Sequence, residues 1–178
     1  FVNSPNALAG NNADKCDTAA ADFQSEQAGL VDVVADEADI LAQIRQLVSM
    51  LPANNEDEAF EEECADDLNR ASAELANCTG DTSIALSTIA DDNVFFEVKE
   101  AYAKEMVTGF VRLNGQTVGC VAHRSEVYGE DGEKTETFDS VLTPAGCEKA
   151  TEFITFCDAF NIPVLSLTNV TGYAACEC

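Results

Sequence analysis

Residues 107–123 read VTGFVRLNGQTVGCVAH, and this stretch decides the fold that we predict for the second half of the chain. Two β-rich apolar runs flank Asn114 and Gly115. An Asn-Gly pair in this position is the strongest short-range signal for a β-hairpin, because both residues accept the positive φ of a type I′ turn. The sequence therefore predicts adjacent antiparallel strands at 107–113 and 117–122.

Residues before and within the hairpin add to this β-type region. Residues 94–98 are rich in Val and Phe, a composition typical of a strand. Gly109 and Gly119 lie inside the two hairpin strands, where a missing side chain indicates that another group packs closely against the backbone.

The hairpin is followed by a loop, a helix and a strand. The polar residues 124–140 predict a long excursion at the surface. Thr143 and Pro144 then predict a helix start, a capping hydroxyl followed by a proline whose missing N–H is harmless there. The predicted apolar face of this helix comprises Ala150, Phe153, Ile154, Cys157 and Phe160.

Asn161 is predicted to end that helix. The next stretch, IPVLSLTNV at 162–170, is nearly all apolar and predicts a strand buried on both faces. Strand, crossover helix and strand in this order predict a right-handed βαβ unit, so the second half contributes to a mixed sheet.

The first half contains one clear strand-and-helix unit. The apolar run 30–34 predicts a short strand, and Asp36 is the expected cap of a helix that Pro52 and Asn54 end. The helix has an apolar stripe at the three and four spacing of one face, which indicates core packing rather than a ligand groove. The stripe consists of Ile40, Leu41, Ile44, Leu47, Val48 and Leu51.

A strongly acidic run separates the two halves. Residues 56–67 read EDEAFEEECADD, with almost no apolar periodicity, and predict an exposed linker or a solvated helix face. We place a domain boundary in or just after this run. Residues 72–92 return to weaker helical character, with Ile84, Leu86 and Ile89 as expected contacts.

Composition limits the classes of function. The chain has 178 residues, 46% of them hydrophobic, which is enough for one globular domain. Its 33 Asp and Glu against 9 Lys and Arg give a net charge of -24, so nucleic acid and flat anionic membranes are not expected partners. No apolar stretch reaches the roughly 20 residues that span a bilayer. Because no loop alternates Asp and Asn before a distal Glu, we interpret the charge as solubility rather than calcium binding.

The cysteine pattern favours reduced thiols and a cytoplasmic location. Six of the eight cysteines are far apart, and several lie in apolar patterns where cysteine behaves as a small hydrophobe. Cys176 and Cys178 are close together but lack a histidine or a second pair, so we expect no metal site. The sequons at Asn77 and Asn169 are read as chance matches.

Two segments resemble a known family. They are FFEVKEAYAKEMVTGFVRLNGQTVGCVAH at 95–123 and ATEFITFCDAFNIPVLSLTNVTGY at 150–173. VTGFxRLNG, VGxVA and FxxFCDAFNIP, in this order, resemble the carboxyltransferase subunits of the propionyl-CoA and methylmalonyl-CoA type and the related α subunits of biotin-dependent decarboxylases, such as the glutaconyl-CoA enzyme. Residues 28–52 resemble that family more weakly.

The resemblance implies an α/β, crotonase-like (ClpP/crotonase) fold that is incomplete, holding the end of the first lobe and the start of the second. Residues 1–53 would be the tail of the amino-terminal lobe and 54–92 an acidic linker and helix. Residues 93–178 would be the first part of the carboxyl-terminal lobe. Because the chain begins with Phe1, we expect that it starts partway through a longer sequence.

The resemblance also implies an activity. Subunits of this family move a carboxyl group between carboxybiotin, held on a separate carrier protein, and an acyl-CoA. Backbone N–H groups from Gly-rich loops stabilise the developing oxyanion. Those loops are expected outside this chain, so the fragment alone is expected to be inactive. The alternative is a non-catalytic folded scaffold that only associates with other parts of the subunit.

The implied partners are an acyl-CoA thioester, a biotin carboxyl carrier protein, further copies of the parent subunit and, for a decarboxylase, a membrane subunit. A fragment should also expose apolar surface where other parts would pack, which predicts self-association.

The resemblance assigns no catalytic side chain to this chain. It does assign wall residues, which would line the binding site for the substrate or for biotin. The resemblance assigns them to two strand ends, with Gly172 and Tyr173 as the best members. The wall residues are Ala122, His123, Val170, Thr171, Gly172 and Tyr173. NVTGY stands where the family usually has DVPGF, and His123 where it usually has Asn.

Four polar residues could have either a functional or a purely structural role. His123, the one histidine of the chain, could be a general base, but the resemblance argues against this role. Arg112 and Lys99 could contact CoA phosphates, yet solvent exposure or a salt bridge is the favoured expectation. Asp158 is expected to cap or pair locally.

Overall fold

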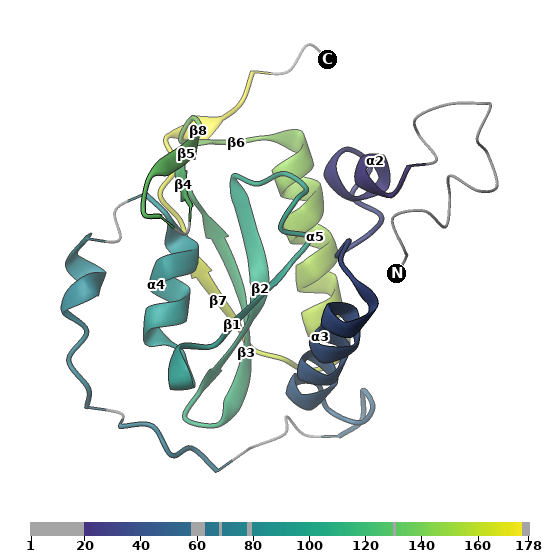
Figure 1. The fold of residues 1–178 in the computed structure, drawn as a ribbon, viewed down its shortest axis with the longest axis vertical. Helices are drawn as coiled ribbons and strands as arrows, with labels where there is room; N and C mark the ends of the chain where they lie inside the picture. Colours follow the sequence, from purple (N-terminus) through teal and green to yellow (C-terminus); the bar gives the residue numbers. More distant parts are fainter. Residues whose placement is uncertain (1–19, 58–62, 68, 78–79, 130, 176–178) are drawn as a thin grey trace.

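A computed structural model of the chain describes residues 20–57, 63–67, 69–77, 80–129 and 131–175. Its centre is a four-stranded sheet in the order β1-β2-β3-β7 (Figure 1). The strands are β1 (Phe95–Val98), β2 (Met106–Leu113), β3 (Gln116–His123) and β7 (Val164–Leu167). Neighbours are antiparallel from β1 to β3, whereas β7 is parallel to β3, so the predicted mixed sheet is confirmed.

The predicted hairpin is present, with each strand within one residue of its predicted bounds. Leu113 pairs with Gln116, and the two residues between them, Asn114 and Gly115, have φ values of 54° and 80°. The carboxylate of Asp91 accepts hydrogen bonds from both of their backbone N–H groups, at 3.0 and 2.6 Å. The turn is therefore fixed both by its own residues and by a capping side chain.

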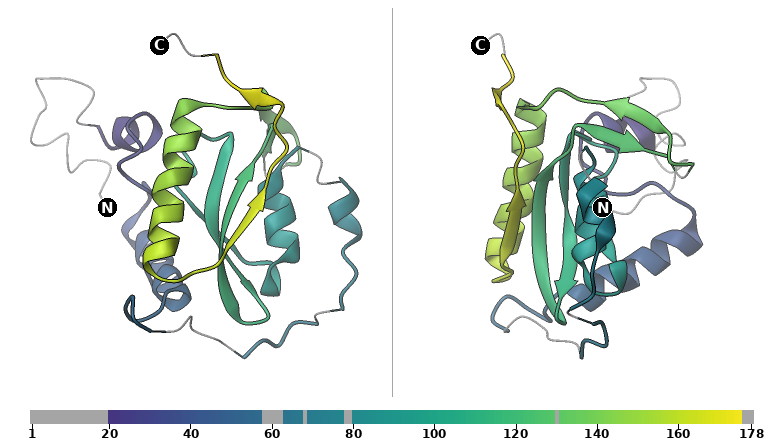
Figure 2. Two further views of the ribbon diagram at one scale, coloured as in Figure 1. Left: turned by 180° about the vertical axis from the view of Figure 1, so that it is seen from behind. Right: turned by 90° about the vertical axis from the view of Figure 1, so that its left-hand side faces the viewer.

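Two helices cover opposite faces of the sheet, as Figure 2 shows. The helix α4 (Thr82–Ile89) covers one face, where Leu86 packs against alternate residues of β2 and β3, including Val107 and Cys120. The helix α5 (Pro144–Ala159) covers the other, where Phe153 packs against Phe110 with ring centroids 5.0 Å apart. The period of two along β2 divides its apolar side chains between these two clusters.

The start of α5 is as predicted, and its apolar face nearly so. The Thr143 hydroxyl accepts a hydrogen bond from the Gly146 N–H at 2.9 Å. Ala150, Phe153 and Cys157 are buried, but Ile154 is 43% exposed, so its assignment to the core was wrong. It lies one residue, about 100° of helix rotation, beyond Phe153 and points away from the sheet.

Both strand glycines lie in close contact with another group, as predicted. A Cβ built on Gly119 would lie 2.6 Å from the Cys157 sulfur, and one built on Gly109 would overlap the Phe96 carbonyl oxygen. In contrast, the prediction that 162–170 is buried on both faces was wrong. Val164 is 41% exposed, because α5 packs over β2 and β3 and leaves that side of β7 uncovered.

The amino-terminal part holds α2 (Ala21–Glu26) and α3 (Glu37–Met50). The strand predicted at 30–34 is absent, since Val33 alone forms an isolated bridge there. The N–H groups of Leu30 and Val31 instead donate to the Gln24 carbonyl, so the chain makes a tight turn after α2.

The helix α3 begins after Asp36, as predicted, although the Asp36 side chain makes no capping hydrogen bond. Its apolar stripe is only half covered. Ile40 is buried and Leu47 packs against the α5 cluster, whereas Leu41 and Val48 are 55% and 65% exposed. Core packing was thus the correct interpretation for one side of the stripe only.

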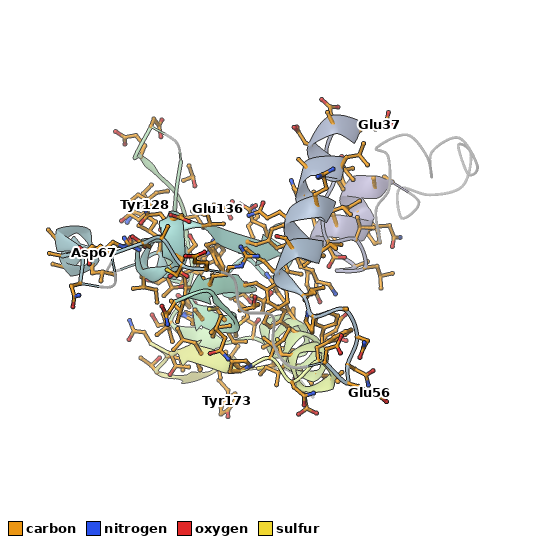
Figure 3. All side chains as sticks on the ribbon, turned by 90° about the horizontal axis from the view of Figure 1, so that it is seen from below. Glu37, Glu56, Asp67, Tyr128, Glu136 and Tyr173 are labelled. Atoms are coloured by element: carbon orange, nitrogen blue, oxygen red, sulfur yellow. The ribbon has the colours of Figure 1, made fainter. Side chains whose placement is uncertain are left out.

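Between α3 and α4 the structure describes residues 51–57, 63–67, 69–77 and 80–81. This connection includes the short 3-10 helix η2 (Ala73–Asn77), and a second one, η3 (Asp91–Asn93), follows α4. The acidic residues Glu37, Glu56 and Asp67, labelled in Figure 3, are exposed at separate places.

The predicted surface excursion at 124–140 contains a small two-stranded sheet of β4 (Glu126–Tyr128) and β5 (Lys134–Thr137). Its first residue departs from the prediction, since Arg124 is only 4% exposed. The last sheet pairs β6 (Val141–Leu142) with β8 (Gly172–Tyr173). No helix in the described part of the chain is long and apolar enough to cross a membrane.

Candidate functional site

The residues predicted to form a binding wall lie at, or a few residues after, the carboxyl ends of two neighbouring parallel strands. Ala122, near the end of β3, pairs with Leu167, the last residue of β7. Because both strands run in the same direction, their ends meet at one edge of the sheet. Loops at the carboxyl ends of parallel strands are where α/β sheets bind ligands.

The segment 170–173 is held in place at this edge by backbone pairing. Val141 pairs with Gly172 and Leu142 with Tyr173. The Thr171 N–H and hydroxyl both donate to the Ser140 carbonyl, at 2.7 and 2.9 Å. Four backbone and side-chain contacts thus fix this segment beside the start of α5.

The predicted wall residues differ in exposure. Tyr173 is 80% exposed and projects from the body of the molecule in Figure 3. A Cβ at Gly172 would meet no atom within 4 Å, so open space lies beside it. Ala122 and His123 are buried. The structure therefore brings the residues to one edge, but only 170–173 reach its surface.

His123 pairs with Met106 across the β2–β3 ladder and is buried. Its Nε2 atom is buried without a hydrogen-bond partner among the described residues. His123 is 3% exposed, so it lies behind the surface of this edge rather than on it.

A buried cluster of charges lies close to the end of β3. The guanidinium of Arg124 ion-pairs with Glu97 at 3.2 Å and lies 3.8 Å from an Asp81 oxygen, and its Nε donates to the Lys104 carbonyl at 2.6 Å. Burial raises the pKa of Glu97, and the positive charge of Arg124 opposes this shift. The cluster fixes the residue that directly follows His123.

Lys149 of α5 is the second buried cation of this region, with 2% of its surface exposed. Its ammonium donates to the Tyr102 carbonyl at 2.7 Å. Burial lowers the pKa of Lys149 to about 8, and the carboxylates of Glu97, Glu105 and Glu100 oppose that shift.

Sequence reasoning missed this charge cluster. Because residues 124–140 were predicted to lie at the surface, the burial of Arg124 was not expected. For Lys149 a signal existed, because it precedes the buried Phe153 by four residues and Cys157 by eight, which places it on the apolar face of α5. A cation at such a position requires a buried partner.

The remaining polar residues engage in local contacts. Lys99 forms a salt bridge with Glu152 at 2.6 Å, one of the two arrangements that the sequence analysis favoured over a contact with CoA phosphates. Arg112 donates to the Ser49 carbonyl at 2.6 Å. Of the cysteines in the described ranges, Cys64, Cys120, Cys147 and Cys157 are free thiols. Cys16, Cys78, Cys176, Cys178 and Thr79 of the first sequon lie outside those ranges.

Comparison with known proteins gives a match over nearly the whole chain. Residues 3–177 match the family model described as carboxyl transferase domain. The propionyl-CoA carboxylase beta chain of Roseobacter denitrificans is 34% identical over 151 residues, covering 78% of this chain and 26% of that protein. The propionyl-CoA carboxylase carboxyltransferase subunit of Haloferax mediterranei is 36% identical over 144 residues, covering 77% and 26%.

A third relative is the methylmalonyl-CoA decarboxylase subunit alpha of Veillonella parvula, 32% identical over 145 residues, with 78% of this chain and 26% of that protein covered. The chain thus spans about a quarter of the length of these relatives.

Solved structures agree with this result. The transcarboxylase 12S crystal structure, a hexamer with methylmalonyl-coenzyme A and methylmalonic acid bound, matches with a TM-score of 0.77 and 29% identity, over 98% of this chain and 34% of that one. A single-chain, multi-domain long-chain acyl-CoA carboxylase matches with a TM-score of 0.60 and 22% identity, over 96% and 16%, which supports the fold alone. The predicted crotonase-like α/β fold is confirmed.

Proposed function

Because this chain belongs to the carboxyl transferase domain family, we propose that the subunit containing it transfers a carboxyl group between carboxybiotin and an acyl-CoA. The match over residues 3–177 carries this proposal, since it includes the sheet, both covering helices and the candidate site together. Three relatives named for propionyl-CoA carboxylase or methylmalonyl-CoA decarboxylase support acyl-CoA as the substrate class.

In this proposal the edge of the sheet at β3 and β7 forms part of the biotin side of the cleft. Residues 170–173 supply the surface, with Gly172 leaving room for a ligand and Tyr173 projecting beside it. Ala122 and His123 support that surface from below. The oxyanion is stabilised by backbone N–H donors of segments beyond this chain, so the chain alone is inactive.

The proposed assembly consists of several copies of the subunit, together with a separate biotin carrier protein. The neighbouring transcarboxylase 12S structure is a hexamer, which supports an oligomer here. A membrane subunit joins only if the parent is a decarboxylase. The proposed domain limits are 1–53, 54–92 and 93–178, and the proposed location is the cytoplasm, where thiols remain reduced.

The test is carboxyl transfer by the intact subunit. Radiolabelled carboxybiotin and propionyl-CoA should yield an acid-stable carboxylated CoA product. Replacing Tyr173 by Ala should lower this rate by about tenfold or more, the size of one lost binding contact. The matched control Tyr128→Ala removes another exposed tyrosine, from β4, and should leave the rate unchanged.

A subunit that folds and forms no carboxylated product from propionyl-CoA or another acyl-CoA would exclude the proposal. Equal rates for both tyrosine variants would remove Tyr173 from the site while leaving the activity in place.

A second candidate function is association without catalysis. The exposed Leu41 and Val48 of α3 favour it, because a helix face of this kind is usually covered by another surface. If association is the sole role, the chain will bind the rest of the subunit while both tyrosine variants leave every measured property unchanged.

A further inference from the structure

A very small sheet holds the exposed segment of the candidate site next to the start of α5. Its strands are β6 and β8, in which Val141 pairs with Gly172 and Leu142 with Tyr173. Residues 168–170, which connect β7 to this sheet, belong to no helix or strand. The main chain at Tyr173, a residue that is 80% exposed, is therefore held by its pairing with β6 rather than by β7.

One side chain closes this pairing where it begins. The hydroxyl of Thr171 donates to the Ser140 carbonyl at 2.9 Å, and the Thr171 N–H donates to the same oxygen at 2.7 Å. A carbonyl oxygen has two lone pairs, so Thr171 alone occupies both of them at Ser140. At the other end the Ala174 N–H donates to the Leu142 carbonyl at 2.9 Å. The two residues of β8 thus lie between two fixed points.

The strand β6 is a firm support for this pairing. It leads directly into Thr143, whose hydroxyl accepts a hydrogen bond from the Gly146 N–H at 2.9 Å and caps α5. The same hydroxyl donates to the carboxylate of Glu105, the residue just before β2. Because β6 is tied to both the helix and the central sheet, a side chain that ties β8 to β6 fixes β8 to the body of the fold.

The bond from the Thr171 hydroxyl has a large effect because the sheet that it closes is small. A two-stranded sheet alone is at best marginally stable, and this one has two residue pairs. One intramolecular hydrogen bond shifts an equilibrium by about twofold to tenfold. When only the closed arrangement binds a ligand, the apparent affinity falls with the fraction of closed molecules. The hydroxyl thus governs binding beside Tyr173 without touching the ligand.

We propose that Thr171 is a positioning residue of the carboxyl-transfer site, an inference that rests on the proposed function. Its hydroxyl holds the main chain of Gly172 and Tyr173 in the arrangement that receives carboxybiotin. It acts through the Ser140 carbonyl, to which its single O–H is directed. The acyl-CoA side of the cleft does not depend on this bond.

Steady-state carboxyl transfer by the intact subunit tests this role, with carboxybiotin varied first and then propionyl-CoA, or another acyl-CoA if that is the better acceptor. Thr171→Val removes the hydroxyl and keeps the shape and the N–H of the residue. It should raise KM for carboxybiotin at least about twofold and leave KM for the acyl-CoA unchanged. Thr171→Ser retains the hydroxyl and should behave like the natural subunit.

Three results of these assays would overturn the proposal. They are an unchanged KM for carboxybiotin in Thr171→Val, an equal rise of both KM values in that variant, and a Thr171→Ser variant that behaves like Thr171→Val. A natural subunit that transfers no carboxyl group would exclude the proposed function and this role with it. An active subunit with unchanged kinetics in Thr171→Val excludes only the role of Thr171.

Thr135→Val is the matched control. The Thr135 hydroxyl also donates to a main-chain carbonyl, that of Val127, at 3.1 Å, in the two-stranded sheet of β4 and β5. Thr135 is exposed, and no residue of that sheet belongs to the candidate site. The variant removes the same kind of bond and should leave both KM values unchanged. Equal effects of the two valine variants would refute a specific role of Thr171.

Hydrogen exchange of the intact subunit without ligand separates positioning from direct contact. In Thr171→Val the Ala174 amide, which donates to Leu142, should exchange about twofold to tenfold faster, because the sheet then opens more often. A hydroxyl that only touched the ligand would leave this amide unchanged in the free subunit. Equal exchange rates in the natural and variant subunits would therefore overturn the proposal.

Discussion

Gly119 of β3 lies directly against Cys157 of α5, so closely that a Cβ on Gly119 would come within 2.6 Å of the sulfur. The contact joins the predicted hairpin to the helix that covers it, with Gly119 in the middle of β3 and Cys157 in the last turn of α5. Cys157 is fully buried, so its sulfur cannot move out into solvent.

Replacing Gly119 by Ala should therefore destabilise the fold by about 1–3 kcal/mol, the usual effect of overpacking a core. The matched control is Gly172→Ala, which adds the same methyl where no atom lies within 4 Å and should change stability little. Urea unfolding followed by circular dichroism measures both. Adding Cys157→Ala to Gly119→Ala should recover part of the loss, and equal stability of both glycine variants would contradict this account.

Replacing Arg124 by Met should be more damaging, at about 3–5 kcal/mol. The change leaves the buried carboxylate of Glu97 without its cation and the Lys104 carbonyl without its donor. The double variant with Glu97→Gln should recover part of the stability, because the carboxylate closest to Arg124 then carries no charge and Asp81 keeps its hydrogen bonds from Ser83. Lys134→Met breaks the exposed pair with Glu126 and should have no measurable effect, so similar unfolding curves for Arg124→Met and Lys134→Met would refute the claim.

The buried Lys149 should make stability depend on alkaline pH. Burial lowers its pKa from the ordinary 10.5 to about 8 in the folded chain. Between pH 8 and 10.5 the unfolded chain thus binds more protons at this position, so the contribution of Lys149 to stability rises with pH, by about 3 kcal/mol over the interval.

Two buried thiols have the opposite effect on stability over part of this pH range. Burial raises the pKa of Cys120 to about 12 and that of Cys157 to about 11, so their contributions are lost as pH rises above about 9. The informative quantity is therefore the stability of the natural chain minus that of Lys149→Met. This difference should increase from pH 8 to 10.5 in urea titrations, and a constant difference would mean that Lys149 does not titrate there.

Exposed apolar residues on α3 should cause self-association. Leu41 and Val48 are seven residues apart and lie on one face of the helix. Replacing both by Glu should lower the fraction of dimer or larger species in sedimentation velocity. Ala42→Glu adds a charge at an exposed position between them and should have little effect. Persistent association of the double variant would place the contact elsewhere.

The elements that the sequence predicts best are those with local chemistry. The turn at Asn114 and Gly115 follows from the backbone preferences of two adjacent residues, and the start of α5 follows from the hydroxyl of Thr143. Such signals do not depend on distant parts of the chain. They were correct to within one residue.

The predictions that failed concern which face is covered. The run 30–34 looked like a strand but forms only an isolated bridge at Val33, and Val164 looked buried although no described helix covers that side of β7. Ile154 is apolar yet lies just beyond the contact face of α5. Coverage depends on elements far away in sequence, so composition alone does not predict it.

The candidate site was predicted from the resemblance to a known family rather than from the chemical properties of its residues. The structure brings the ends of β3 and β7 to one edge, but nothing in the local sequence of Gly172 or Tyr173 indicates binding. The Arg124 and Lys149 cluster was missed because its members are distant in sequence and join only in the folded chain.

The parallel pairing of β3 with β7 has a consequence for the order of folding. The hairpin closes over two residues, whereas Gly119 meets Val164 only after the 44 residues between them have been closed into a loop. Closing the longer loop loses more entropy, and contacts of this range slow folding. We expect β2 and β3 to form early and β7 to join last, so pulse-labelling hydrogen exchange should protect the hairpin amides before those of β7.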